Sequence, residues 1–162
     1  MILLFTVSDM YIDYLRKFDQ LVLYNKQEVR PYLGTIVLAN STKYYVPMSS
    51  PKEKFKKMKN SKDFHKIDGG NYGALNFNNM IPVKDSELVK IDIDNEPDEL
   101  YKNLLQRQHK ALSEIKETIN LKAQALYNLY VCSDELTTSD LRVKQRCCNF
   151  PLLEEKMNEF KK

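Results

Sequence analysis

Residues 33–48 read Leu33-Gly34-Thr35-Ile36-Val37-Leu38-Ala39-Asn40-Ser41-Thr42-Lys43-Tyr44-Tyr45-Val46-Pro47-Met48, two apolar runs joined by a polar, turn-prone triplet. Runs of this length that are rich in β-branched and aromatic residues are typical of strands. Because the run at 33–39 is almost continuously apolar, we expect it to lie centrally in a sheet. The run at 43–48 is predicted to be the next strand, after a turn at 40–42.

Further strands are predicted where apolar residues run together or alternate with polar ones, at residues 2–7, 73–77, 80–83 and 87–93. Between the first of these and the central pair, residues 19–32 have mixed composition and contain Pro31. We expect this segment to be a loop that carries Arg30.

Helical spacing of apolar residues marks the other elements. Ser8 or Asp9 is expected to cap a helix near the N-terminus. Beyond Pro97 the spacing stays helical, and a last helix is predicted to begin near Pro151. Strands first and helices later indicate an α+β fold with an antiparallel sheet, and residues 1–162 are predicted to form one domain.

Composition excludes several classes of protein. No segment is apolar for long enough to span a bilayer, and residues 1–7 are too short for the core of a signal peptide. The three cysteines, Cys132, Cys147 and Cys148, are odd in number and contain no Cys-x-x-Cys. They argue against a disulfide framework and against a zinc site with His65 or His109. We expect reduced thiols in a cytoplasmic protein.

The second apolar run ends in Ser49-Ser50-Pro51-Lys52. Ser50 is a good helix N-cap and Pro51 suits a first helical position, which predicts a helix N-terminus able to bind a phosphate. The net charge is only +3, but seven lysines lie between residues 51 and 67, which favours a nucleic-acid backbone as the ligand. The simpler alternative is an ordinary helix with solvated lysines.

Familiar catalytic motifs are absent from the sequence. There is no Gly-rich nucleotide loop and no paired metal-binding motif, so no metal or other cofactor is expected. Asp92, Asp94 and Glu96 could hold a cation, but alternation on a half-exposed strand explains them more simply. His65 or His109 could act as a general base, although a solvated position is the simpler expectation for His109.

The remaining chemistry consists of hydroxyls, fixed cations and ten tyrosines. Such a set can cleave RNA without a metal, because the RNA supplies its own nucleophile, the 2′-hydroxyl. The protein then has to stabilise the charge that builds on the phosphate. Aromatic side chains can stack on unpaired bases, although tyrosines at core spacing, such as Tyr14 and Tyr44, are more often packed.

Ordered motifs along most of the chain resemble one known family. They are Phe5-Thr6-Val7-Ser8, Tyr11-Ile12-x-Tyr14-Leu15-x-x-Phe18, Gly34, Lys43-Tyr44, Pro47, Ser49-Ser50-Pro51-Lys52, Met80-Ile81-Pro82 and Cys148-Asn149-Phe150-Pro151-Leu152-Leu153-Glu154-Glu155-Lys156. In this order they resemble the ToxN/AbiQ endoribonucleases, the toxins of bacterial type III toxin–antitoxin systems.

The resemblance implies a twisted antiparallel sheet like the Kid/MazF barrel, with added helices. It implies metal-independent cleavage of cellular or phage RNA to a 2′,3′-cyclic phosphate, in the context of abortive infection and phage defence. It also implies inhibition by an antitoxin RNA of tandem repeats, which docks in the active groove and closes a ring-shaped toxin–RNA assembly.

The family's site residues carry over by position. Ser49, Ser50 and Lys52 would form the catalytic loop, and Arg30 stands where the family often has Lys. A Tyr that some relatives carry before the Arg30 position has no match in register, Tyr24 being the nearest. The predicted RNA-binding residues are Tyr11, Lys54, Lys56, Lys57 and Phe150.

Two alternatives remain open at this point. The first is a non-catalytic protein that binds single-stranded RNA with the same basic groove. The second is a protein whose lysine helix contacts an acidic protein surface. Product chemistry separates the first from an enzyme, and titration with RNA against an acidic polypeptide separates the second.

Overall fold

A computed structural model describes residues 2–36 and 41–162. The strands are β1 (Leu4–Val7), β2 (Tyr32–Ile36), β3 (Lys43–Ser49), β4 (Phe64–Lys66), β5 (Ala74–Asn76), β6 (Ile81–Pro82) and β7 (Leu88–Lys90). They form one antiparallel sheet in the order β4-β5-β3-β2-β1-β7, with β6 also paired to β3. The predicted α+β fold is confirmed. The sheet is open, with β4 and β7 at its edges, and does not close into a barrel.

The predicted central strand pair is confirmed by β2 and β3, which pair along five positions from Tyr32↔Pro47 to Ile36↔Lys43. Strand β2 is flanked by β3 and β1, as its apolar sequence predicts. The end of the predicted run at 33–39 and Asn40 of the predicted turn lie outside the described residues.

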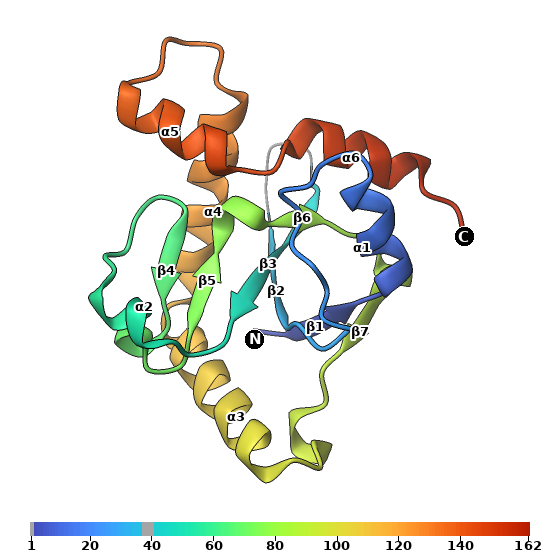
Figure 1. Ribbon diagram of the computed structural model, residues 1–162, viewed down its shortest axis with the longest axis vertical. Coiled ribbons are helices and arrows are strands. Elements are labelled where there is room, and N and C mark those ends of the chain that lie inside the picture. The colour runs from blue at the N-terminus through green and yellow to red at the C-terminus, as the bar shows by residue number, and fades with distance from the viewer. Residues whose placement is uncertain (1, 37–40) are drawn as a thin grey trace.

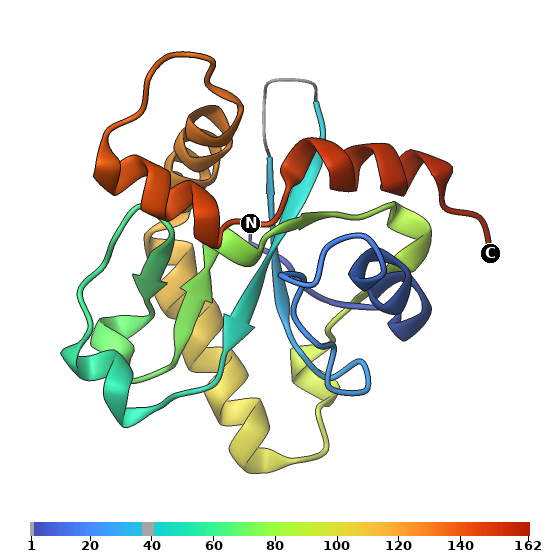
Figure 2. The ribbon, with the colours of Figure 1, turned by 45° about the horizontal axis from the view of Figure 1, so that its top comes forward.

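The α-helices of the described residues are α1 (Asp9–Arg16), α2 (Glu53–Lys57), α3 (Glu99–Glu114), α4 (Lys116–Val131), α5 (Thr138–Arg146) and α6 (Phe150–Glu159). Short 3-10 helices lie at η1 (Asp68–Gly70), η2 (Phe77–Asn79), η3 (Asp85–Glu87) and η4 (Ile93–Asn95). Helices α3 and α4 follow one another along one side of the sheet, whereas α1 and α6 lie together near the C-terminus (Figures 1 and 2). None of these helices has the length and apolar character needed to cross a membrane.

Helix α1 forms where the sequence predicts it. The Ser8 hydroxyl caps it by accepting from the Tyr11 N–H at 3.3 Å. Tyr11, Ile12 and Leu15 then face the core. The strand predicted at 87–93 is shorter, since β7 ends at Lys90 and Asp92 accepts from Asn95 at 2.6 Å in a turn-forming arrangement.

The N-terminal and C-terminal segments close on each other. The Tyr14 hydroxyl donates to the Lys156 carbonyl at 2.8 Å, and the Phe160 ring packs edge-on against Tyr11 with centroids 5.0 Å apart. The Cys148 N–H donates to the Asn78 carbonyl at 2.8 Å, where α6 approaches β6. Helix α6 therefore seals the part of the core that lies under α1.

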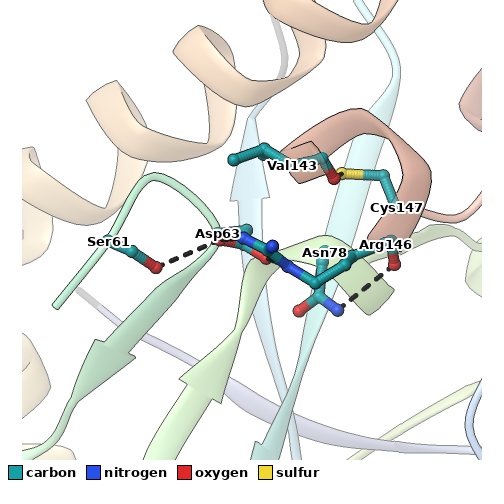
Figure 3. Close-up of polar contacts among 6 residues, drawn as sticks. All are labelled: Ser61, Asp63, Asn78, Val143, Arg146 and Cys147. Atoms are coloured by element: carbon teal, nitrogen blue, oxygen red, sulfur yellow. Dashed lines mark hydrogen bonds and ion pairs between the residues drawn. The ribbon is translucent and has the colours of Figure 1, made fainter. Parts of the chain in front are cut away.

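An ion pair between a buried aspartate and an exposed arginine attaches α5 to the β4 edge of the sheet. Asp63 is 4% exposed and accepts from Arg146 Nε and a terminal guanidinium nitrogen, both at 2.9 Å. Ser61 adds a third hydrogen bond, and Asn78 donates to the Arg146 carbonyl (Figure 3). Burial raises the pKa of Asp63, but the bonds from Arg146 and Ser61 outweigh it and leave that pKa below its usual value.

Candidate functional site

The site begins where β3 leaves the sheet. Ser49 is the last residue of β3 and pairs with Ala74 of β5. Ser50 follows and is exposed. The backbone stays extended through Lys52 (φ −142°, ψ 144°), and α2 starts only at Glu53. The two serines and Lys52 therefore lie within four residues of one another on one segment, with Pro51 between Ser50 and Lys52, at the end of β3.

This geometry contradicts the predicted helix start. Lys52 is the N-cap residue of α2, not Ser50, and Pro51 lies outside the helix. The physical reason is packing: the five-residue helix is placed so that Phe55 is buried against Phe64 and Ala74. A helix this short supplies no anion site at Ser50, so an anion bound here would have to be held by the hydroxyls and the side-chain cations.

Backbone contacts fix Ser49 in position. Gly73, at φ +102°, lies so close that a Cβ there would be 2.0 Å from the Ser49 carbonyl oxygen. The Asn76 side-chain amide donates to Ser49 Oγ at 2.7 Å. Because Asn76 occupies an acceptor position of the hydroxyl, the Ser49 O–H remains available as a donor.

Arg30 lies beside the same strand end. Its Nε donates to the Tyr24 carbonyl at 3.0 Å and a terminal nitrogen donates to the Met48 carbonyl at 3.1 Å. These bonds use two of the five guanidinium N–H groups, which leaves three for a ligand. Burial lowers the pKa of Arg30, and the nearby, fully buried Tyr32 opposes that shift slightly. Arg30 thus bonds to the carbonyl of the residue that precedes Ser49.

Tyr24, the nearest tyrosine before Arg30, has its ring against the Arg16 guanidinium. The Arg16 guanidinium lies 3.7 Å from the centroid of the Tyr24 ring, and that ring is 70% exposed. Arg30 bonds to the Tyr24 carbonyl, whereas the Tyr24 ring lies against Arg16. Tyr24 therefore does not supply an aromatic wall of the site in this structure.

Lys26 lies in the same loop as Arg30, and sequence reasoning did not single it out. Its pKa is lowered, first by the charge of Arg30, then by burial, then by the charge of Lys52. The loop around it has three consecutive residues with left-handed backbone, Lys26, Gln27 and Glu28, at φ 51°, 59° and 66°. Non-glycine residues in this region are strained and are concentrated at functional sites. No sequence pattern reveals them, because none of the three is glycine.

The predicted lysine surface is exposed, and the predicted aromatics are not. Lys54, Lys56 and Lys57 lie on α2 and are all exposed, with Lys56 3.1 Å from Glu53. Tyr11 and Phe150, expected to line the groove, are fully buried at 0% exposure.

Contacts within the core explain the burial of both aromatics. The Tyr11 hydroxyl donates to the Pro82 carbonyl at 2.6 Å, and the Phe150 ring packs against Tyr44 and Tyr130. Neither ring presents a face to a base in this structure.

The histidines and carboxylates form no second site of the predicted kinds. His65 Nδ1 lies 3.1 Å from Lys122 Nζ, and burial together with that lysine lowers the His65 pKa. His109 Nε2 lies 3.0 Å from the Ile2 carbonyl and is partly buried, contrary to the solvated position expected for it. Within residues 2–36 and 41–162, no group of three His, Cys, Asp or Glu is placed to hold a metal ion.

Comparison with known proteins gives a consistent result. Residues 3–158 match the family model described as toxin ToxN, type III toxin–antitoxin system. The endoribonuclease ToxN of Bacillus thuringiensis subsp. kurstaki is 36% identical over 160 residues, which are 96% of this chain and 82% of that protein. The endoribonuclease AbiQ of Lactococcus lactis subsp. lactis is 32% identical, over 98% of this chain and 88% of that protein.

Solved structures agree with the sequence relatives. One, from work on selective toxin inhibition by a non-coding RNA pseudoknot in type III systems, has a TM-score of 0.87 at 34% identity and covers 98% of this chain and 96% of its own. The structure of AbiQ, described as a lactococcal anti-phage endoribonuclease, has a TM-score of 0.78 at 31% identity. The match covers 98% of this chain and 97% of the AbiQ chain.

Proposed function

This chain belongs to the ToxN family of type III toxin–antitoxin toxins, and we propose that it is an endoribonuclease whose active site is the end of β3 together with Arg30. One observation carries the assignment of the site. Ser49, Ser50, Lys52 and Arg30 lie around the end of β3, and neither cation forms an ion pair with a carboxylate in the described part of the chain. Two hydroxyls beside two uncompensated cations match a phosphodiester.

The arrangement suits cleavage by transesterification. The 2′-oxygen of the RNA forms a bond to phosphorus as the bond to the 5′-oxygen breaks, which leaves a 2′,3′-cyclic phosphate and a 5′-hydroxyl. The 2′-hydroxyl loses its proton and the leaving oxygen gains one. Arg30 and Lys52 stabilise the negative charge that grows on the non-bridging oxygens, and Ser49 and Ser50 donate hydrogen bonds to them.

The antitoxin is proposed to be an RNA of tandem repeats that occupies the same groove. The relative described above is inhibited by a non-coding RNA pseudoknot, and the exposed lysines of α2 in this chain suit a phosphate backbone. Closure of toxin and RNA into a ring is part of this proposal. The three cysteines are free thiols, in keeping with action on RNA in the cytoplasm.

The test is a cleavage assay on single-stranded RNA with Ser50→Ala and Lys52→Ala. Both side chains are exposed, so the variants should stay folded, yet each should lose about 10²–10³-fold in rate. Lys43→Ala, at the far end of β3, is the matched control and should cleave normally.

Product analysis separates the enzyme from a protein that only binds RNA. A 2′,3′-cyclic phosphate formed in excess EDTA supports the mechanism. A 5′-phosphate product, or full activity of folded Lys52→Ala, would refute it.

A further inference from the structure

Three cations converge at this site without a counter-ion. Lys26 lies in the loop that the bond from Arg30 Nε to the Tyr24 carbonyl closes, and a terminal nitrogen of Arg30 reaches the Met48 carbonyl near the end of β3. In keeping with this placement, the charges of Arg30 and Lys52 both lower the pKa of Lys26. In the part of the chain that the structure describes, none of the three forms an ion pair. The Lys52 Nζ lies 5.7 Å from the centroid of the Phe55 ring, and the Arg30 guanidinium donates to two backbone carbonyls. Like charges gathered this way repel one another unless an anion binds between them.

The loop that carries Lys26 is fastened on both sides. Asn25 is 5% exposed and donates to the Val7 carbonyl at 2.6 Å and to Asp9 at 2.8 Å. On the other side, Arg30 bonds to the Tyr24 carbonyl. These anchors keep the left-handed backbone at Lys26 in place and hold this lysine beside Arg30.

The one carboxylate of the segment between Asp19 and Glu53 bonds to the start of α1 and not to the cations. Glu28 is the only acidic residue between Asp19 and Glu53. Its Oε2 accepts from the Asp9 N–H at 2.8 Å, at the start of α1. Glu28 therefore does not neutralise Lys26, although it is only two residues away.

We infer that Lys26 is a further phosphate-contacting residue, which completes with Arg30 and Lys52 a three-cation site for the RNA backbone. The inference rests on the proposed function, because it places the same RNA phosphate at Arg30 and Lys52. It adds a residue that carries no motif in the sequence.

Mutual repulsion gives this site a measurable signature. Arg30 and Lys52 lower the pKa of Lys26, and a bound phosphate reverses that effect. Binding at alkaline pH is therefore accompanied by proton uptake on Lys26. RNA affinity should fall as pH rises through the pKa of Lys26 in the free protein. An arginine at this position stays protonated throughout and should remove that fall.

The experiment measures the binding of a mixed-sequence 2′-O-methyl single-stranded oligonucleotide, which cannot be cleaved because its nucleophile is blocked. Titrations of the wild type, Lys26→Gln and Lys26→Arg are run over a salt series at neutral pH and over a pH series up to 10. Lys52→Gln tests the proposed site itself, and Lys43→Gln is the surface control.

The expected results are specific. Lys26→Gln should weaken binding about tenfold at low salt and flatten the slope of log affinity against log salt by about 0.7. Lys26→Arg should keep neutral-pH affinity and lose the alkaline fall. If Lys52→Gln weakens binding but Lys26→Gln matches Lys43→Gln, the role of Lys26 is refuted and the proposed site stands. If Lys52→Gln is also without effect, the proposed site itself fails.

Discussion

Substitution of Gly73 by alanine should damage the active site through the backbone of Ser49. The added Cβ would lie 2.0 Å from the Ser49 carbonyl oxygen, whereas non-bonded atoms of this kind approach to about 3 Å. Ser49 therefore has to move by roughly 1 Å, and a displacement of that size costs about 10²-fold in rate. The backbone at φ +102° also strains any side chain. Strain and overpacking together should lower the free energy of unfolding by about 3–5 kcal/mol.

Gly69→Ala provides the matched control. Gly69 also has a positive φ, +62°, but a Cβ there would meet nothing within 4 Å. It should lose only about 1–2 kcal/mol and cleave RNA at the wild-type rate. Urea denaturation and single-turnover cleavage of RNA, with rates normalised to the folded fraction, measure both quantities. The reasoning fails if folded Gly73→Ala cleaves as fast as Gly69→Ala.

Three other perturbations test the packing around the site. Phe150→Ala should lower the free energy of unfolding by about 3–5 kcal/mol, because the ring is a core residue, while oligonucleotide affinity of the folded protein stays unchanged. A loss of affinity of about 1–3 kcal/mol without a loss of stability would instead show that the ring stacks on a base. Asp63 has a lowered pKa in the fold, so its stabilising bond to Arg146 is present above about pH 4 and is lost as pH falls below that value. Urea titrations at several pH values measure the fall in the free energy of unfolding below about pH 4, and Asp63→Asn should make that fall smaller. An unchanged fall would show that other carboxylates cause it. At pH 8 a thiol reagent should label Cys132 in the folded protein and leave Cys147 unreacted, since burial raises the pKa of Cys147 to about 12. Rapid labelling of all the thiols would show that the core under α6 opens readily.

The sequence predicted the sheet well because apolar runs and turns report directly on strands. Residues 32–36 and 43–49 form the central pair where both runs indicated strands. Helix α5 was not predicted, because Val143 is its only buried residue and a single apolar position produces no helical pattern. The extra length given to the strand at 87–93 was wrong for the opposite reason, since the alternation of apolar and polar residues continues from β7 into the turn at η4.

The site was only partly readable. Local chemistry and the family resemblance pointed to Ser49, Ser50 and Lys52 of the proposed site, but the predicted helix cap failed because burial of Phe55 determines where α2 starts. Lys26 was not singled out because its proposed role depends on how the loop between α1 and β2 folds, which no local pattern reports. The helical pattern could show that Tyr11 faces inward, but not whether that face meets core or groove.

The hydrogen bond between Tyr14 and Lys156 also bears on when the protein can fold during its synthesis. These residues are 142 positions apart, and a ribosome adds about 5–20 residues per second, so α6 is made roughly 7–28 s after α1. Until then α1 lacks the segment that covers it, and α1 is the anchor of the loop that carries Arg30. A growing chain is therefore expected to be inactive while it is still attached to the ribosome. We expect such a delay to protect the messenger RNA from the toxin that it encodes.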